Sequence, residues 1–405
     1  MKILIYSANF APEPTGIGKY SGEMAVWLAS QGHQVRVVAA PPYYPAWKIS
    51  AGYIWPPYRL ENFEGINIWR APLWVPSQPG GLLRVIHLLS FALSSLPVML
   101  LHCFWRPNVV FTVAPAFVCA PMGALTARLC GARAWLHVQD FEVDVAFRMG
   151  ILKGRRLQKM VRGLERSVLR RFDEVSSISE KMVSLLAHKG VDPARCYHFP
   201  NWVDVQHIQP LTETSSYRQE LGIAEDAVVM LFSGSLGSKQ DLMLIPQAAR
   251  KLAHLDKLVF VVCGDGVMKQ ELEDGTRDLR QFRLLPLQPF NRLSELLGLA
   301  DAHLLTQSVD AQDLVLPSKL SGMLASGRPI IATCNAETEI GNVVSRCGLL
   351  ANPGDVDSLA NAIAQLYYAP DMRRTLGVQA RQCALDSFTK SSVLQRMLKR
   401  MQTLH

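Results

Sequence analysis

Residues 2–18 read KILIYSANFAPEPTGIG, and this stretch decides the class of fold. The apolar run Lys2–Tyr6 predicts a buried strand, and the loop with Gly16 and Gly18 predicts a tight entry into a helix. A second apolar run, Gln34–Val38, follows that helix and predicts the next strand. A strand, a glycine turn, a helix and a further strand form the repeating unit of a doubly wound parallel sheet.

The second half of the chain repeats this pattern. Residues 228–237 read VVMLFSGSLG, a helix is expected from about Leu242 to His254, and the strand Leu258–Val262 leads into Gly264-Asp265-Gly266. We therefore predict an α/β protein with two Rossmann-like doubly wound domains facing a cleft, in which ligands bind at the carboxyl ends of the strands. The predicted boundaries are residues 1–200, residues 201–386 and a C-terminal helix at 387–405, with Pro200–Pro210 as the hinge.

Other apolar runs complete the two sheets. Further strands are expected at Ile66–Arg70, Val109–Val113, Ala134–Val138, Glu174–Ile178, Phe282–Leu285, Ala302–Leu305, Ile330–Thr333 and Gly348–Leu350. Ser179 is expected to cap a helix, and Asp357 or Ser358 to cap the amphipathic helix Leu359–Tyr368. The run Asp355-Val356-Asp357 is interpreted as part of a helix cap rather than as a metal site.

Composition places the chain among globular proteins of the reducing, cytoplasmic compartment. Its 405 residues are 49% hydrophobic and 19% charged. The 8 cysteines form no C-x-x-C pair, which is typical of small buried side chains rather than of disulfides or a zinc site. Lys2 opens a strand rather than the apolar region of a secretory signal.

The net charge of +8 is concentrated in one segment. Residues 153–171 hold eight basic residues against Glu165 alone. The segment fits a solvated helix face, or a polybasic surface for anionic lipid or a diphosphate. We rank nucleic acid last, because no aromatic platform accompanies the charge.

The apolar stretch Gly81–Trp105 is long enough to be tested as a membrane span. Arg84, His87 and His102 argue against spanning, and Pro97 is expected to break the helix. We predict a pair of helices, partly buried and partly in the plane of a membrane interface, with ordinary core helices as the alternative. The protein is therefore expected to attach peripherally to the inner membrane through its anionic surface.

Two polar clusters are candidates for chemistry. His137 and Asp140 follow each other at the end of a predicted strand, where functional residues gather in such sheets. Asp140, Glu142 and Asp144 form an acidic run, but we do not predict a metal site there. In the second half, Pro317-Ser318-Lys319 starts a helix that ends at Gly327. A lysine in the first turn opposes the helix dipole unless an anion is present, so Ser318 and Lys319 predict a diphosphate site.

The first glycine loop does not predict a nicotinamide cofactor. It offers Gly16 and Gly18, but Ser21 stands where the third glycine of the dinucleotide fingerprint belongs. Its backbone amides suit an anionic or sugar ligand, and a simple tight turn explains the glycines equally well.

Seven segments, taken in order, resemble the retaining glycosyltransferases of the two-Rossmann-domain (GT-B) fold, in the group-one family. They cover nearly the whole chain: Thr15–Gly18, His137–Asp140, Pro200–Asp204, Ser233–Gly237, Gly264–Gly266, Pro317–Pro329 and Gly348–Asp355. Within that family the chain is most similar to the fucosyl- and N-acetylfucosaminyltransferases of bacterial exopolysaccharide assembly, such as that of colanic acid.

The resemblance implies a nucleotide-sugar donor, GDP-fucose, held mainly by the C-terminal domain. The acceptor, a polyprenyl-diphosphate-linked sugar, would lie on the N-terminal domain, and no cofactor or metal is implied. Carried over, His137 touches the transferred sugar and Lys319 holds the diphosphate with the Ser318 amide. The other implied donor-binding residues are Gly16, Gly18, Ser235, Gly237, Lys239, Gly264 and Glu339.

The chain also departs from the family pattern. Leu314 and Gly322 occupy the places of the family's paired glutamates, and Ser235 that of its phosphate-binding arginine. These departures leave three alternatives beside a fucosyltransferase: a transferase for another donor, a sugar-nucleotide epimerase on the same fold, and a non-catalytic membrane scaffold.

Overall fold

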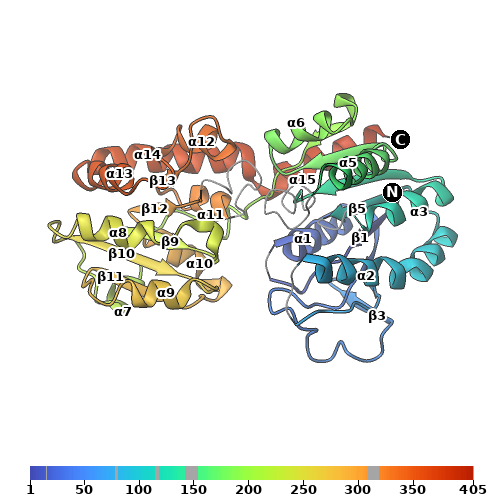
Figure 1. Cartoon of the computed structure of the whole chain (residues 1–405), viewed down its shortest axis with the longest axis horizontal. Coiled ribbons are helices and arrows are strands. Elements are labelled where there is room, and N and C mark those ends of the chain that lie inside the picture. Colours follow the sequence, from blue (N-terminus) through green and yellow to red (C-terminus); the bar gives the residue numbers. More distant parts are fainter. Residues whose placement is uncertain (15, 78–80, 115–117, 142–153, 309–318, 405) are drawn as a thin grey trace. The chain divides into compact units, whose positions relative to one another are not determined.

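The computed structural model describes residues 1–14, 16–77, 81–114, 118–141, 154–308 and 319–404. The chain forms two compact units (Figure 1). Unit 1 comprises Met1–Pro200 together with Leu394–His405, and unit 2 comprises Asn201–Val393. Each unit is built on its own sheet.

The sheet of unit 1 has the strand order β3-β4-β2-β1-β5-β6-β7-β8 among the described residues. Neighbouring strands are parallel except β3 and β4, which are antiparallel. The central strands are continuous apolar runs because helices cover both faces of a parallel sheet. The strands are β1 (Lys2–Ser7), β2 (Gln34–Ala39), β3 (Arg59–Phe63), β4 (Ile66–Arg70), β5 (Val109–Ala114), β6 (Arg133–Val138), β7 (Glu174–Ser177) and β8 (Cys196–His198).

The helices of unit 1 include the apolar and the basic segments of the sequence. They are α1 (Gly16–Ser30), α2 (Gly81–Leu101), α3 (Ala120–Cys130), α5 (Arg155–Leu169) and α6 (Glu180–His188), with 3₁₀ turns η1 (His102–Trp105) and η2 (Pro193–Arg195). The last helix, α15 (Lys390–Thr403), begins in unit 2 and ends in unit 1. There Arg400 forms a bidentate ion pair with Glu174, at 2.9 and 3.0 Å.

The predicted break in the apolar stretch is wrong. Helix α2 continues through Pro97 as one helix of 21 residues. It is held on β1, where Phe91 stacks on Tyr6 at 5.4 Å between ring centroids and Ser95 Oγ lies 2.7 Å from the Tyr6 hydroxyl. These contacts before the proline, together with the buried Met99 after it, offset the backbone hydrogen bond that a proline cannot donate.

The sheet of unit 2 has the order β11-β10-β9-β12-β13-β14, and every pairing in it is parallel. This is the order of dinucleotide-binding α/β folds. Its strands are β9 (Val228–Ser233), β10 (Leu258–Cys263), β11 (Phe282–Leu285), β12 (Ala302–Leu305), β13 (Ile330–Thr333) and β14 (Gly348–Ala351).

Short and amphipathic helices flank this sheet in Figure 1. They are α7 (Tyr217–Glu220), α8 (Leu244–Lys251), α9 (Lys269–Asp274), α10 (Leu293–Gly298), α11 (Lys319–Ala325), α12 (Glu339–Val344), α13 (Val356–Tyr368) and α14 (Pro370–Cys383). The 3₁₀ turns are η3 (Ser238–Gln240) and η4 (Phe290–Arg292), and a π-helical turn, η6, spans Ala384–Phe388.

Two helix caps test the expectations from sequence. Ser179 caps α6, accepting a hydrogen bond from the Met182 N–H at 3.2 Å, as predicted. Asp355, rather than Asp357 or Ser358, caps α13, because its extended backbone lets its carboxylate accept the Ser358 N–H at 3.0 Å. Asp357 already lies in the first helical turn, where it cannot act as the cap.

Candidate active site

The candidate site in unit 2 lies where the sheet changes winding direction. Strands β9 and β12 are neighbours there, although β10 and β11 come between them in the sequence. The loops after the two strands meet, since the Ser308 N–H donates to the Lys239 carbonyl at 2.9 Å. Ligands of doubly wound sheets bind in the crevice at this switch point.

Glycines let the loops after β9 and β10 pack directly on each other. A Cβ at Gly264 would lie 1.9 Å from the Gly234 carbonyl oxygen, and one at Gly266 would lie 2.5 Å from that of Leu236. The Gly234 N–H donates to the Cys263 carbonyl, and the Leu236 N–H to that of Asp265. A side chain at Gly264 or Gly266 would therefore separate the two loops.

Lys319 supplies a buried positive charge beside these loops. Its Nζ is enclosed, lies 3.8 Å from the centroid of the Phe232 ring and has no hydrogen-bond partner among the described residues. A Cβ at Gly234 would lie 3.2 Å from the Lys319 Cδ, so the lysine stem passes against this glycine. Burial lowers the pKa of Lys319 to about 7. An ammonium group in this position would be stabilised by an anion.

His303 was not predicted from the sequence, and it lies in β12. Its Nε2 is 2.9 Å from Ser326 Oγ, and the Ser326 hydroxyl donates to the Met323 carbonyl. Since that hydroxyl has a single hydrogen, Nε2 must carry the proton and donate it. Nδ1 then keeps a buried lone pair without a partner in the described part of the chain. Burial, with the charges of Arg328 and Lys319, lowers the pKa of His303 to about 3, so the ring is neutral.

Of the predicted donor-binding residues of unit 2, Ser235, Gly237, Lys239 and Gly264 lie in the loops after β9 and β10, whereas Glu339 lies after β13. Ser235 and Lys239 are exposed, and Gly237 directly precedes the 3₁₀ turn that contains Lys239. Glu339 begins α12 directly after its cap, Thr338, and is half-buried. The prediction for Ser318 concerns a position outside the described residues.

The glycine loop of unit 1 encloses a buried carboxylate. Glu13 accepts the Tyr43 and Tyr44 N–H groups at 3.1 and 3.0 Å, and the Asn9 amide at 3.0 Å. Burial raises the pKa of Glu13 despite these bonds. A Cβ at Gly18 would lie 2.6 Å from that of Glu13, so Gly18 makes room for this residue. Gly16 has a φ of +59° and open space around it.

His137 lies within the sheet of unit 1 and is 3% exposed. Its Nδ1 is 3.0 Å from Ser176 Oγ on the neighbouring strand, and its ring lies 4.9 Å from that of Phe199. Burial lowers the pKa of His137 to about 3. The ring is therefore neutral at physiological pH. Asp140, beyond the end of β6, is half-buried.

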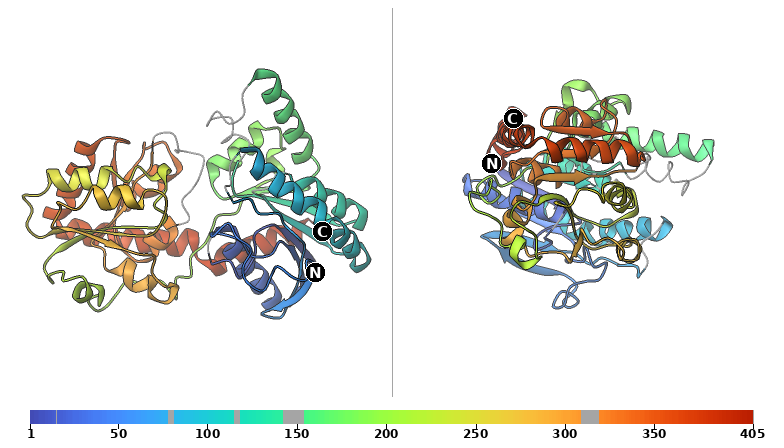
Figure 2. Two further views of the ribbon diagram at one scale, coloured as in Figure 1. Left: turned by 60° about the horizontal axis from the view of Figure 1, so that its bottom comes forward. Right: turned by 90° about the vertical axis from the view of Figure 1, so that its left-hand side faces the viewer.

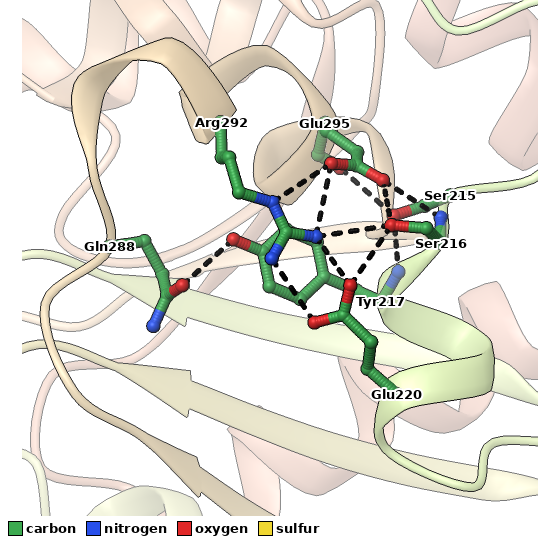
Figure 3. A network of polar contacts seen from close by, with 7 residues as sticks. All are labelled: Ser215, Ser216, Tyr217, Glu220, Gln288, Arg292 and Glu295. Carbon is green, nitrogen blue, oxygen red and sulfur yellow. Dashed lines mark hydrogen bonds and ion pairs between the residues drawn. The ribbon is translucent and has the colours of Figure 1, made fainter.

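A polar network braces the loop after β11 (Figure 3). Arg292 lies over the Tyr217 ring at 3.9 Å from its centroid and pairs with Glu220 and Glu295. The Tyr217 hydroxyl donates to the Gln288 side-chain oxygen at 2.9 Å. Hydrogen bonds from Arg292 hold the pKa of the Glu220 carboxyl below its usual range. Because the charged groups of the network pair with one another, we assign the network a structural rather than a catalytic role.

No local feature of the sequence marks the two unpredicted residues, Phe232 and His303. Both residues stand inside strands of apolar sequence, so neither differs from an ordinary core residue there. Only their position near Lys319 in the folded chain distinguishes them. Within the described ranges, no three His, Cys, Asp or Glu side chains cluster as metal ligands would.

Sequence comparison matches each half of the chain to a known protein family. Residues 15–202 match the glycosyl transferase 4-like domain, and residues 213–383 match glycosyl transferases group 1. WcaI of Escherichia coli K12, a glycosyl transferase assigned to colanic acid biosynthesis, is 38% identical over 98% of this chain and 99% of its own length.

Solved structures share the fold. Sucrose-phosphate synthase from Thermosynechococcus elongatus has a TM-score of 0.75 at 15% identity, covering 100% of this chain and 99% of its own. HepE of Anabaena, in complex with UDP-glucose, has a TM-score of 0.72 at 14% identity, covering 100% of both chains.

Proposed function

Because the chain belongs to the group 1 glycosyltransferases of the GT-B fold, we propose that it transfers a sugar from a nucleotide-sugar donor during exopolysaccharide biosynthesis. The observation that carries the proposal is Lys319, whose buried Nζ lies at the switch point without a partner among the described residues. A diphosphate is the anion that such a donor brings. The relationship to WcaI supports the pathway.

The proposed chemistry needs the leaving diphosphate to be stabilised as its charge grows. The bond from the anomeric carbon to the diphosphate breaks, and a bond to the acceptor oxygen forms. Lys319 and the backbone amides of the β9 loop would stabilise the departing charge. The acceptor proton would pass to a donor phosphate oxygen, with retention of configuration and without a metal ion. His137 would contact the transferred sugar as a neutral ring.

We propose GDP-fucose as the donor, as in a colanic acid fucosyltransferase. UDP-N-acetylfucosamine and GDP-mannose are the alternatives. The complex of HepE with UDP-glucose supports including a UDP-sugar among them. A non-catalytic scaffold would not require an enclosed ammonium group beside the glycine loops that follow β9 and β10. The proposed acceptor is a polyprenyl-diphosphate-linked sugar at the cytoplasmic face of the inner membrane, with the protein attached peripherally.

A thermal-shift panel of nucleotides and nucleotide sugars tests donor choice. A ligand at a hundred times its dissociation constant stabilises the folded protein by about 2.7 kcal/mol. The selected donor should then release nucleoside diphosphate only when lipid-linked acceptor is present. Donor binding without release would favour the scaffold, and no shift with any nucleotide sugar would overturn the proposal.

A further inference from the structure

One face of α2 and η1 exposes apolar side chains along its whole length. We name it the outer face of α2 and define it as Ile86, Leu89, Leu93, Pro97, Leu100 and Phe104. These positions recur every three or four residues and so share one side of the helix. Leu93 is 68% exposed and Phe104 is 88% exposed. Six consecutive apolar positions on one exposed side form a patch of the kind that marks an interaction site.

The opposite face fixes α2 on the sheet. Phe91 and Ser95 are buried against Tyr6, and Met99 is also buried. By length and composition alone, Leu83–Trp105 passes as a membrane span, with 39% of its window buried. Crossing a bilayer would remove the contacts with β1. The helix can instead present its outer face to a partner while its inner face stays packed.

The charges in the stretch of sequence that contains α2 have a single sign. No Asp or Glu occurs from Gly65 to Gln139, although the chain holds 34 acidic residues. The charged residues of that stretch are all arginines: Arg70, Arg84, Arg106, Arg128 and Arg133. Arg84 and Arg106 are exposed, one at each end of the face. A surface that is apolar in the middle and cationic at its ends complements anionic lipid.

Aromatic side chains accompany these cations. Beside η1, the Arg36 guanidinium lies 4.4 Å from the centroid of Trp105, and Lys2 Nζ is 3.1 Å from its carbonyl oxygen. Near the other end, Arg84 lies 6.0 Å from the Trp47 ring centroid. Tryptophans and snorkelling cations are the residues that proteins place at the level of lipid headgroups.

Helix α3 packs alongside α2, as the blue and teal helices of Figure 2 show. Its exposed residues include Leu125, Arg128 and Leu129, which repeat the combination of apolar and cationic side chains. The composition of the outer face of α2 thus extends to its neighbour.

We propose that the outer face of α2 binds the surface of an anionic lipid bilayer, with the helix axis in the plane of the interface. From Ile86 to Phe104 the face extends about 27 Å, at a rise of about 1.5 Å per residue. A second copy fits less well, because a twofold dimer through this face would oppose arginines to arginines. The proposal rests on the proposed function only in that a membrane-bound acceptor gives the attachment its purpose.

The test is flotation of the full chain with vesicles of phosphatidylglycerol and phosphatidylcholine, and with vesicles of phosphatidylcholine alone. The variant is Leu93→Gln/Phe104→Gln, and the matched control is Val378→Gln, which changes a residue 71% exposed on α14. We expect binding to the anionic vesicles, a fall of at least about tenfold in the partition coefficient for the double variant, and none for the control. High salt should release only part of the bound protein, since apolar insertion is not screened.

Two results would overturn the proposal: absence of binding to anionic vesicles at low salt, or equal binding of wild type and double variant. A concentration-dependent dimer in sedimentation that the double variant abolishes, without vesicle binding, would assign the face to a second copy instead. Thermal melting checks that the variant is folded. A nucleotide sugar should shift the melting temperature of both proteins equally, so loss of that shift in the wild type would refute the proposed function separately.

Discussion

Raising the pH should weaken nucleotide-sugar binding by removing the proton from Lys319. Burial lowers the pKa of Lys319 to about 7 in the free protein, and a bound diphosphate would raise it again. Binding above pH 7 must therefore take up a proton. The affinity for the nucleotide sugar is greatest below pH 7. Above it, the affinity falls about tenfold, or 1.36 kcal/mol, for each further pH unit. Between pH 7 and pH 9 we expect the dissociation constant to rise about fiftyfold.

Isothermal titration calorimetry from pH 7 to pH 9 measures both the dissociation constant and the number of protons taken up on binding. Titrations in two buffers of different ionisation enthalpy should show uptake of nearly one proton at high pH. Lys319→Met should bind the nucleotide sugar about ten- to a hundredfold more weakly at pH 7, because one charge-assisted hydrogen bond is lost. The affinity of this variant should then change little with pH. The matched control is Lys251→Ala, which removes an exposed lysine paired with Asp357. A dissociation constant in the wild type that stays constant from pH 7 to pH 9 would refute the reasoning, as would an unchanged slope in Lys319→Met.

The ligand-free protein provides an independent check. Because the folded-state pKa of Lys319 lies below its value in the unfolded chain, the buried charge destabilises the fold fully below about pH 7. This destabilisation fades as the pH rises towards about 10.5. Lys319→Met should therefore raise the melting temperature more at pH 6 than at pH 9.

Three further results are expected. Arg400→Ala should lower the free energy of unfolding by about 3–5 kcal/mol because it leaves Glu174 buried without its partner, and adding Glu174→Gln should restore part of the loss in chemical denaturation. His137→Ala should reduce turnover more than donor affinity in steady-state kinetics; near wild-type activity would make the residue purely structural. Charge reversal at Lys159 and Arg162, both exposed on α5, should weaken binding to anionic vesicles in low salt while donor affinity measured by calorimetry stays the same.

The elements that the sequence predicted well are those whose burial is complete. The runs that became β1, β9 and β10 are apolar because both faces of a parallel sheet are covered. Strand β3 was missed since it is a polar edge strand with most of its residues exposed. Strand β8 has only three residues, too few for a period to show.

The candidate site was only partly predictable, because its properties depend on tertiary neighbours. The sequence singled out Lys319 from its place at a helix start, but the enclosure of its Nζ against Phe232 comes from packing. His303 stands in a short apolar strand with no local mark of its hydrogen bond to Ser326. Pro97 shows the reverse case, where a strong local signal for a break was overridden by the packing of α2 on β1.

The return of α15 to unit 1 has a consequence for biosynthesis. Leu394, Met397 and Met401 are fully buried, and Arg400 neutralises Glu174 from the end of the chain. A ribosome releases these residues after all of unit 2, so the first unit to be translated is the last to be completed. A chain that terminates early would expose an apolar surface and an unpaired buried carboxylate. Cellular proteases are therefore expected to degrade copies that end before α15 faster than copies that contain it.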